Sequence, residues 1–549
     1  MTTDTRNRQA NPWLVLLALC LGFFMILLDT TIVNVAIPNI IDKVGTSLDE
    51  ALWVVNAYVL VYAVLLITAG RLGDIVGPRT MFMAGLALFV LASAACGLSR
   101  NAGELIAARA VQGVGGAMIT PQTLTIITTI FPPERRGAAF GIWGAVAGVA
   151  TVAGPTLGGY LVTEWDWRYI FFVNLPVGVV AFVLALVVVP DLRPGRRHRL
   201  DLLGVALASA SLTALTYGMI EGERYHWGTI WRFVGIPAVL GAGGVLLIAF
   251  LVWQRVQKTE PLLPFEVFRD RNFSVTSFVA AALTFGMLGI FLPLTIYLQS
   301  VLGLSALAAG LTVAPMSMMS MLLAPFTGRL ADRIGGKYIL MTGLFLFAGG
   351  IGLVVVTTAA GSGRWDFLAG LLVAGAGMGC VFAPMQTVAM RDIPPRLAGA
   401  ASGVQNTIRQ LGGAIGGAAV GALLQNRLAA SLHDQAQQRA GALPRPFRSR
   451  FVTGFDHAAS HGLQVGSGQS GTKLELPKGL PQPVVEQIQR VAHAVFTHGY
   501  VDAMHPTLVL PIAVIALAGL ACLGIRRHRA SASPPEGRPE GAPQTHAQA

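Results

Sequence analysis

Charged side chains are scarce in this sequence. Only 12% of its 549 residues are Asp, Glu, Lys or Arg, whereas 54% are hydrophobic. The mean hydropathy is +0.62. A soluble protein of this length needs a more polar surface. The composition therefore excludes an ordinary soluble protein and predicts a chain that lies in a lipid bilayer.

Cysteine is also rare. The sequence has four cysteines, all inside apolar segments and none in a CxxC pair: Cys20, Cys96, Cys380 and Cys522. This pattern gives no sign of a disulfide framework or a thiolate metal site.

A nucleotide-binding motif is missing. The dipeptide Gly336-Lys337 is followed by Tyr338, so the Walker pattern GxxxxGK[ST] is not completed. ATP is therefore not expected as the direct energy source, and no cofactor is indicated. A proton gradient is the expected source of energy for any transport.

The formal charge of +12 does not indicate nucleic-acid binding. The basic residues lie between apolar runs and form no stripe with interleaved aromatic residues, which a nucleic-acid surface would show. The chain is instead expected to meet the lipid bilayer, small amphipathic molecules and protons, and to act as a monomer.

Fourteen mostly apolar segments are each long enough to cross a hydrocarbon core of about 30 Å. They lie near residues 13–37, 50–70, 80–99, 103–130, 138–163, 169–190, 202–220, 233–253, 273–299, 306–327, 338–358, 366–390, 400–424 and 507–525. With the N-terminus inside, most Lys and Arg residues fall in inner loops. The sequence thus predicts a multi-pass protein of a bacterial cell membrane with both termini cytoplasmic.

Two phrases recur at nearly the same offset. GRLGDIVGPR at residues 70–79 returns as GRLADRIGGK at 328–337, and PPERRGAAFG at 132–141 returns as PPRLAGAASG at 394–403. Repetition at one offset indicates duplicated halves. The offset leaves room for two extra segments between them, so the expected fold is all-α, with two pseudo-symmetric six-helix bundles and two inserted spans.

This organisation divides the chain into six expected parts. They are an N-terminal bundle (1–190), a basic linker with two inserted spans (191–272), five spans of the C-terminal bundle (273–424), a long outer loop with an amphipathic helix (425–506), a last span (507–525) and a cytoplasmic disordered tail (526–549).

Five motifs stand in order on the expected spans. They are LLDTTIVNVAIP in span one, GRLGDIVGPR after span two, ELIAARAVQGVGGA in span four, GPTLGG in span five and WRYIFFVNLPVG entering span six. In this the sequence resembles the major facilitator superfamily, and within it the fourteen-span drug:proton antiporters. The resemblance implies the fold of that superfamily and multidrug efflux, with antibiotic resistance as its consequence.

Asp29 is the clearest acidic residue deep inside an expected span. Its charge is costly in lipid unless it faces protein or water, so its protonation should depend on its surroundings. Arg109 in span four lies at a similar depth, roughly 10–12 Å below the outer boundary at 1.5 Å per residue, so the two can meet. The resemblance assigns both residues to proton coupling. A static buried ion pair, or an Asp29 that caps a helix break near Pro38, is the alternative.

Aromatic and polar residues on the spans are candidates for substrate binding. They are Asn34, Trp53, Asn56, Tyr58, Tyr62, Gln112, Tyr297, Gln405 and Arg409. Aromatic residues near span ends also serve as interfacial anchors, and Arg409 could equally serve packing. The buried negative charge of Asp29 favours amphipathic cations as substrates, although neutral compounds remain an alternative.

The repeated phrase predicts a conformational latch in each half. Its residues are Gly70, Arg71, Asp74, Gly77 and Arg79 in the first copy and Gly328, Asp332, Arg333, Gly335 and Lys337 in the second. The aspartates should lie beside cytoplasmic helix N-termini, where the helix dipole favours an acid. Contacts that form when the cytoplasmic side closes would bias alternating access. A solvated basic loop would explain the arginines but not the repeated aspartate and glycines.

The GPxxGG pattern of span five comprises Gly154, Pro155, Gly158 and Gly159. Small residues allow close helix approach, and Pro155 removes one backbone hydrogen bond. The resemblance marks this pattern as an antiporter motif, which favours export over uptake.

The expected outer loop carries several histidines. His457 and His461 have ligand spacing, but no HExxH surrounds them, so no metal site is assigned. The leading hypothesis is a proton-coupled exporter of amphipathic, cationic drugs. A dedicated exporter of one endogenous metabolite, lipid or antibiotic is the alternative. A membrane sensor or enzyme is a third hypothesis, for which the short inner loops offer little room.

Overall fold

The computed structural model describes residues 11–191, 200–222, 224–225, 227–231, 234–257, 261–460 and 482–526. The basic linker after Asp191, the GSGQSG stretch of the expected outer loop, His461 and the tail after residue 526 lie outside these ranges.

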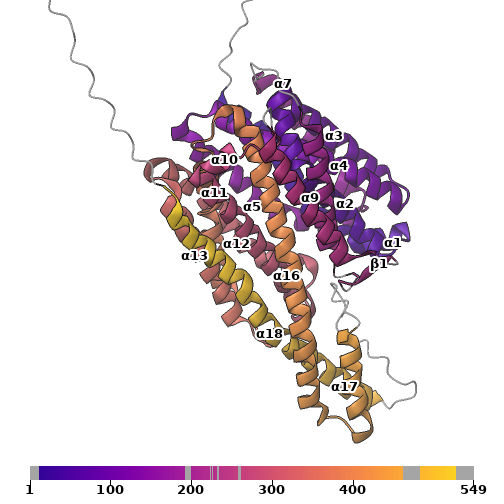
Figure 1. Ribbon diagram of the computed structural model, residues 1–549. Coiled ribbons are helices and arrows are strands. Elements are labelled where there is room, and N and C mark those ends of the chain that lie inside the picture. The colour runs from indigo at the N-terminus through magenta and orange to yellow at the C-terminus, as the bar shows by residue number, and fades with distance from the viewer. Residues whose placement is uncertain are drawn as a thin grey trace, which may run out of the picture.

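The N-terminal half is a bundle of long helices, drawn in indigo and purple in Figure 1. It comprises α1 (Pro12–Val44), α2 (Leu48–Val76), α3 (Pro78–Leu98), α4 (Ala102–Ile130), α5 (Pro133–Glu164), α6 (Tyr169–Phe172) and α7 (Asn174–Val188). Asn11 caps α1, Asn101 caps α4, and Ser47 with Glu50 forms a capping box at α2. Polar caps thus begin helices whose interiors are apolar.

The inserted segment forms a helix pair with a small strand hairpin at its turn. α8 (Leu202–Glu221) packs on α9 (Ile236–Val256), and β1 (Thr229–Trp231) pairs antiparallel with β2 (Val234–Gly235). The fold is all-helical, as expected, and this short hairpin is a local exception. Asp201 caps α8 and also accepts hydrogen bonds from Trp253 and Gln254, so it joins the first turn of α8 to the last turn of α9.

The C-terminal half repeats the bundle, drawn from magenta to yellow in Figure 1. Its helices are α10 (Glu266–Arg269), α11 (Arg271–Ile296), the π-helix η1 (Tyr297–Val301), α12 (Ala306–Ile334), α13 (Gly336–Thr357), α14 (Leu368–Gly379), α15 (Phe382–Met390), the 3₁₀ turn η2 (Pro395–Leu397), α16 (Ala398–Ala440), α17 (Arg445–Ser460), α18 (Gln482–Ala521) and the 3₁₀ turn η3 (Cys522–Gly524).

Twelve helical segments of the described residues are long and apolar enough to cross a membrane. Both inserted helices, α8 and α9, are among them. The two expected spans outside these twelve, 103–130 and 400–424, are nevertheless helical and correspond to α4 and the first part of α16. Both pack inside the molecule, where polar and small residues replace lipid-facing apolar ones: α4 buries Arg109 and Gln112, and α16 buries Gln405 and Asn406.

The segment expected as a long outer loop, 425–506, is mainly helical where the structure describes it. α16 and α18 continue well beyond the bundle and pack with α17 into a helical projection, seen at the bottom of Figure 1. Residues 484–496, within the segment where an amphipathic helix is expected, are helical and belong to α18. Ile488 and Val495 are buried in a core that also contains Leu432 and Phe451.

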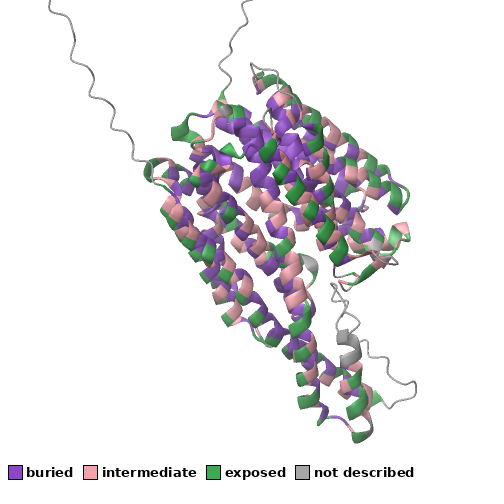
Figure 2. Cartoon of the chain, viewed as in Figure 1, coloured by how far each residue is buried: buried purple, intermediate pink, exposed green. Residues whose placement is uncertain are grey.

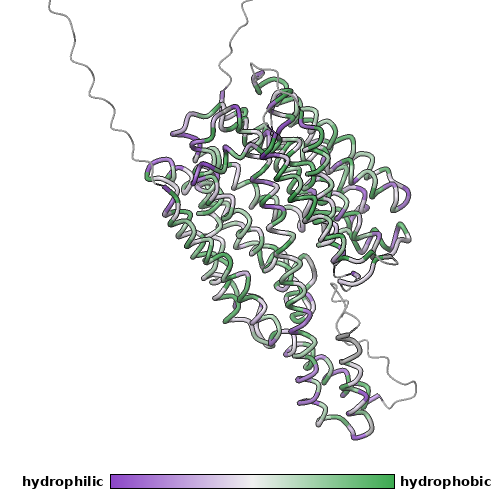
Figure 3. The backbone as a smooth tube through the Cα atoms, viewed as in Figure 1, coloured by the Kyte–Doolittle hydropathy of each residue, from purple (hydrophilic) through white to green (hydrophobic). Residues whose placement is uncertain are grey.

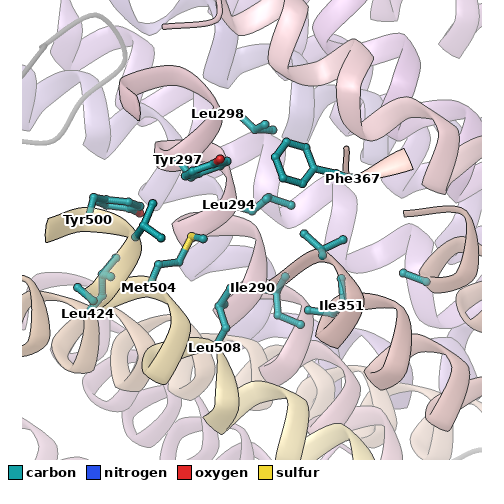
Figure 4. Close-up of a cluster of buried hydrophobic side chains, with 14 of the residues drawn as sticks. Ile290, Leu294, Tyr297, Leu298, Ile351, Phe367, Leu424, Tyr500, Met504 and Leu508 are labelled. Atoms are coloured by element: carbon teal, nitrogen blue, oxygen red, sulfur yellow. The ribbon is translucent and has the colours of Figure 1, made fainter. Parts of the chain in front are cut away.

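Burial follows the two bundles. In Figure 2 buried residues fill the interior of each half, and exposed residues cover the outside. Figure 3 shows apolar residues along the helices and polar ones gathered at the helix ends and in the projection. Figure 4 shows part of the core of the C-terminal half, where Tyr297 and Phe367 lie among aliphatic side chains. We call the end of the bundle that carries residues 70–79 and 328–337 the motif end.

Candidate functional site

Asp29 of α1 and Arg109 of α4 form an ion pair in the interior of the N-terminal half. Nη1 of Arg109 lies 2.5 Å from Oδ2 of Asp29, and both residues have no exposed surface. The same guanidinium donates through Nε to the carbonyl of Val54 and through Nη1 to Oε1 of Gln112. The sequence-based expectation that the two charges meet is confirmed.

Two amides complete the surroundings of the carboxylate. Nε2 of Gln112 donates to Oδ1 of Asp29 over 2.9 Å, and Nδ2 of Asn174 donates to the same oxygen over 3.2 Å. Nδ2 of Asn174 also lies 3.1 Å from Oγ of Ser93. Asn174 and Ser93 were not predicted as site residues, although Asn174 is the only amide side chain of the motif WRYIFFVNLPVG. Gln112, which is also expected to bind substrate, is part of this network.

Tyr58 and Tyr62 also border this network. The guanidinium carbon of Arg109 lies 4.3 Å from the ring centre of Tyr58, a cation–π contact, and Tyr58 stacks on Tyr62 at 5.9 Å. The hydroxyl of Tyr62 donates to Thr120. In this arrangement Tyr58 is fully packed behind Arg109, so the ring supports the ion pair.

This group balances one buried carboxylate against one buried cation. Asp29 is the acid of the network, and its ionised form is matched by one cation and two amide donors. Breaking one side of a buried ion pair is costly, because the remaining charge is left unmatched in a medium of low polarity. A proton on Asp29 therefore changes the energy of Arg109 and of the helices that hold it.

The repeated phrases join the two halves at the motif end. Asp74 of α2 accepts hydrogen bonds from the backbone N–H groups of Gly399 (3.1 Å) and Ala400 (2.9 Å), at the start of α16. Asp332 of α12 accepts them from Gly137 (2.7 Å) and Ala138 (3.0 Å), just after the first turn of α5. Each aspartate thus binds a helix N-terminus of the opposite half, as the dipole argument predicts.

The glycines of the phrases bring these helices into backbone contact. A Cβ at Gly70 would lie 2.5 Å from the carbonyl of Gly399, and one at Gly328 would lie 2.0 Å from the carbonyl of Gly137. The partner glycines belong to the second repeated phrase, PPERRGAAFG and PPRLAGAASG. The first phrase of each half therefore packs on the second phrase of the other half.

The ends of the phrases have structural roles. Gly77 and Gly335 have φ values of +103° and +87°, which side chains other than glycine rarely tolerate, and they let one long helix turn directly into the next. Arg79 donates to the carbonyl of Leu186 at the end of α7, and Lys337 to those of Leu523 and Ile525 after α18. Both cations cap helix C-termini within their own half.

The two other arginines of the phrases differ in exposure. Arg71 is buried at the motif end, whereas Arg333 is exposed.

The GPxxGG motif packs α5 on α1 next to Asp29. A Cβ at Gly154 would lie 2.0 Å from Oγ1 of Thr31, and one at Gly158 would lie 2.7 Å from the side chain of Ile32. Pro155 lies on another face and approaches Gly310 of α12, in the other half, where a Cβ added to Gly310 would lie 3.3 Å from the proline ring. The motif therefore links the helix that carries Asp29 to the interface between the halves.

This packing predicts different effects for two neighbouring glycines. Gly154→Ala should lower the thermal stability of the purified protein by about 1–3 kcal/mol and reduce export, because the added methyl must push α1 away from α5. Gly159→Ala is the matched control, since a Cβ there meets nothing within 4 Å. Thermal unfolding and dye export, measured on both variants, check this. Equal behaviour of the two variants would contradict the close packing.

The remaining substrate candidates do not converge on one site. The structure brings Trp53 to Tyr217 of α8, and it leaves Asn34 exposed with its amide bonded to the carbonyl of Thr30. Tyr297 has no exposed surface and donates to the carbonyl of Ala359, inside the core of Figure 4, so it does not line a cavity here. Asn56 is half-buried.

Two further candidates lie on α16. Gln405 is buried, and neither polar atom of its side-chain amide has a hydrogen-bond partner. Arg409 is half-buried one turn later, and its backbone carbonyl accepts a hydrogen bond from Thr284 of α11. No group of three or more His, Cys, Asp or Glu residues suited to a metal ion occurs in the part of the chain that the structure describes.

Several known proteins are similar in sequence to most of this chain. The chain is 38% identical over 526 residues to the MFS-type transporter Rv1250 of Mycobacterium tuberculosis, covering 95% of this chain and 83% of that protein. It is 35% identical to the tetracenomycin C resistance and export protein of Streptomyces glaucescens, covering 78% of each chain. It is also 35% identical to the multidrug resistance protein Stp of Mycobacterium tuberculosis, covering 79% of each.

Solved structures with low sequence identity share the fold. The human organic anion transporter MFSD10 matches with a TM-score of 0.57 at 13% identity, covering 92% of this chain and 99% of that one. The proton:xylose symporter XylE matches with a TM-score of 0.54, also at 13% identity, covering 83% and 94%. The sequence profile of the Major Facilitator Superfamily, a family of transporters and not of enzymes, matches residues 19–417. The chain therefore belongs to the Major Facilitator Superfamily and is a multi-pass membrane transporter.

Proposed function

We propose that this transporter is a drug:proton antiporter that exports amphipathic, cationic compounds by alternating access. The observation that carries the proposal is the buried Asp29–Arg109 pair, because it places one protonatable group in a network that joins α1, α4 and α7. A proton that enters at Asp29 weakens its pairing with Arg109, and this change can alter how the helices pack. No cofactor takes part, and the chain acts as a monomer.

The proposal includes a topology of fourteen spans. α4 and α16 cross the membrane with the twelve more apolar segments, because each lies among helices that do so. The motif end faces the cytoplasm, because the Lys and Arg residues of the expected inner loops gather there. Both chain termini are then cytoplasmic, and the projection of α16, α17 and α18 lies on the opposite side in this multi-pass protein of a bacterial cell membrane.

For the substrate, we propose that Asp29 supplies the negative charge that favours cations. Asn34, Trp53, Asn56, Gln405 and Arg409 remain the candidate contacts. The unpartnered amide of Gln405 supports its inclusion, because a buried amide without a partner is costly and a bound molecule could satisfy it. The name of the relative Stp, a multidrug resistance protein, supports a broad range of substrates.

A dedicated antibiotic exporter is the second candidate. It is favoured by the names of two relatives: the tetracenomycin C resistance and export protein, and a probable actinorhodin transporter of Streptomyces coelicolor that is 34% identical over 443 residues. Under this alternative the proton-coupling network is the same, and only the range of compounds is narrow.

The test is exchange of dye for protons by the wild-type protein. Everted vesicles with an acidic interior should accumulate a fluorescent cationic dye, and dye entry should be accompanied by proton efflux. Vesicles without the protein are the control. Dye transport that ignores the pH gradient would contradict proton coupling, and transport of one compound class alone would favour the dedicated exporter.

A further inference from the structure

A pocket of about 460 Å³ lies where the inserted helices meet the interface between the two halves. One wall comes from α8, α9 and the segment that leads into α11, and the other comes from α2 and α16. Its volume is in the range of small-molecule sites. The pocket differs from the Asp29 network in its chemistry, because none of the residues that line the pocket is charged.

The mouth of the pocket is apolar. Leu251 of α9 and Phe265 line it and are 37% and 38% exposed, although both are large hydrophobic residues. Exposed apolar residues on α9, an apolar helix long enough to cross a membrane, are expected to face lipid. A ligand would therefore reach this pocket from the bilayer and would carry no charge.

Two hydroxyl groups in the wall set a second requirement. Ser211 of α8 and Thr407 of α16 border the pocket but are only 0% and 3% exposed, so their hydroxyls lie just behind its apolar surface. Neither hydroxyl has a hydrogen-bond partner. Buried threonines elsewhere in the bundle, such as Thr276 of α11 and Thr387 of α15, bond to a carbonyl one turn earlier. A buried hydroxyl without a partner costs free energy, and rotation about its side-chain bond can offer it to a ligand.

We propose that this pocket binds a neutral, largely apolar ring compound that carries one hydrogen-bond acceptor and enters from the bilayer. The rings of Phe250, Phe265 and Phe268 favour an aromatic ligand, and the hydroxyls favour a ligand with a carbonyl over a plain hydrocarbon chain. Since the walls come from both halves and from the inserted helices, such a ligand stabilises the arrangement in which the halves meet at the motif end.

The inserted helices thereby acquire a role of their own, because they supply one whole wall of the pocket. The proposal does not rest on proton coupling: it concerns binding, and it would stand if Asp29 proved to be purely structural.

Photolabelling with benzophenone tests the proposal. This neutral diaryl ketone has the required chemistry, and under light it bonds to nearby C–H groups. Full-length protein in lipid nanodiscs is irradiated over a range of benzophenone concentrations, and labelled peptides are mapped by mass spectrometry. We expect saturable labelling in α8, α9 and α16. Ser211→Ala and Thr407→Val should each raise the half-saturating concentration about fivefold, as the loss of one neutral hydrogen bond predicts.

Two further variants test whether the labelling occurs in this pocket. Ala208→Phe places a ring in the pocket and should remove the saturable labelling, since Ala208 lines the pocket and is buried. Ser277→Ala is the matched control, because Ser277 also has a buried hydroxyl without a partner but does not line the pocket. It should label like the wild type. The two hydroxyl variants change little volume, so they keep the test valid if Ala208→Phe fails to fold.

Two outcomes would overturn the proposal. Labelling that does not saturate, spreads over all lipid-facing helices and persists in folded Ala208→Phe shows simple partitioning into the bilayer. Unchanged affinity in Ser211→Ala and Thr407→Val, together with a co-purified lipid that native mass spectrometry finds on the wild type but not on Ala208→Phe, shows that an acyl chain occupies the pocket.

Discussion

Asp29→Asn should abolish dye accumulation driven by a pH gradient in everted vesicles, to the level of vesicles without the protein. The amide cannot carry a proton through the cycle, so no exchange of dye for protons can occur. The measurement is dye entry and proton efflux, followed together for the wild type and the variant at equal amounts of protein. Normal exchange by the variant would show that Asp29 is structural.

A loss of transport could also arise from misfolding, because the neutral amide would leave Arg109 as an unmatched buried cation, at a cost of about 3–5 kcal/mol. The double variant Asp29→Asn/Arg109→Gln separates the two causes. It removes both charges, so no buried charge is left unmatched, and it should recover much of the thermal stability that Asp29→Asn loses. We expect it to remain inactive in exchange. Recovery of exchange together with stability would mean that the pair serves only to hold the helices.

The Asp29–Arg109 pair could be predicted from the sequence, because the depth of a residue along a helix follows from its position in the span. Asp29 and Arg109 lie at similar depths on two spans, and two opposite charges in a bilayer seldom remain apart. Asn174 could not be placed in the same way. It follows the short helix α6, so its direction depends on how the chain re-enters the bundle between Phe172 and Asn174, which no periodicity reveals.

The pairing of the repeated phrases was hidden for a different reason. The sequence shows that each half carries both phrases, but it does not show which copy meets which. The answer, that Gly70 meets Gly399 and Gly328 meets Gly137, depends on how the halves pack. Likewise, Tyr297 was a candidate ligand by its position near a span end, yet its ring is surrounded by core residues of its own half.

Hydropathy explains the difference between fourteen expected spans and twelve apolar segments. α4 and the first part of α16 pack among other helices. They therefore need fewer lipid-facing apolar residues, and they carry polar residues and glycine instead. The strand hairpin between α8 and α9 was also beyond prediction, since β1 and β2 are three and two residues long, and short strands leave little periodicity to detect.

The second large effect is expected at the motif end. Asp74→Asn should open the contact between α2 and α16, because an amide offers one acceptor oxygen where the carboxylate offers two, and it loses the charge that the N-terminus of α16 favours. Hydrogen bonds to a charged group contribute about 1.5–3 kcal/mol each. Loss of one should therefore shift the equilibrium between closed and open forms about tenfold or more.

Accessibility of a single cysteine measures this shift. Ala401 has no exposed surface at the start of α16, so Ala401→Cys, in a variant without the four native cysteines, should react slowly with a water-soluble maleimide. Adding Asp74→Asn should raise the reaction rate about tenfold. Asp366→Asn is the matched control: Asp366 also accepts a backbone N–H, from Gly363, but within one half and away from the motif end.

The two copies of the phrase should differ in strength. Asp74 is buried, whereas Asp332 is only half-buried, so water competes less for the hydrogen bonds of Asp74. Asp332→Asn should therefore raise the reaction rate of the cysteine less than Asp74→Asn does, and the double variant should exceed either. If both single variants react like the parent, the carboxylates do not hold the halves together. In that case, the glycine contacts alone, which remain in every one of these variants, would have to keep the motif end closed.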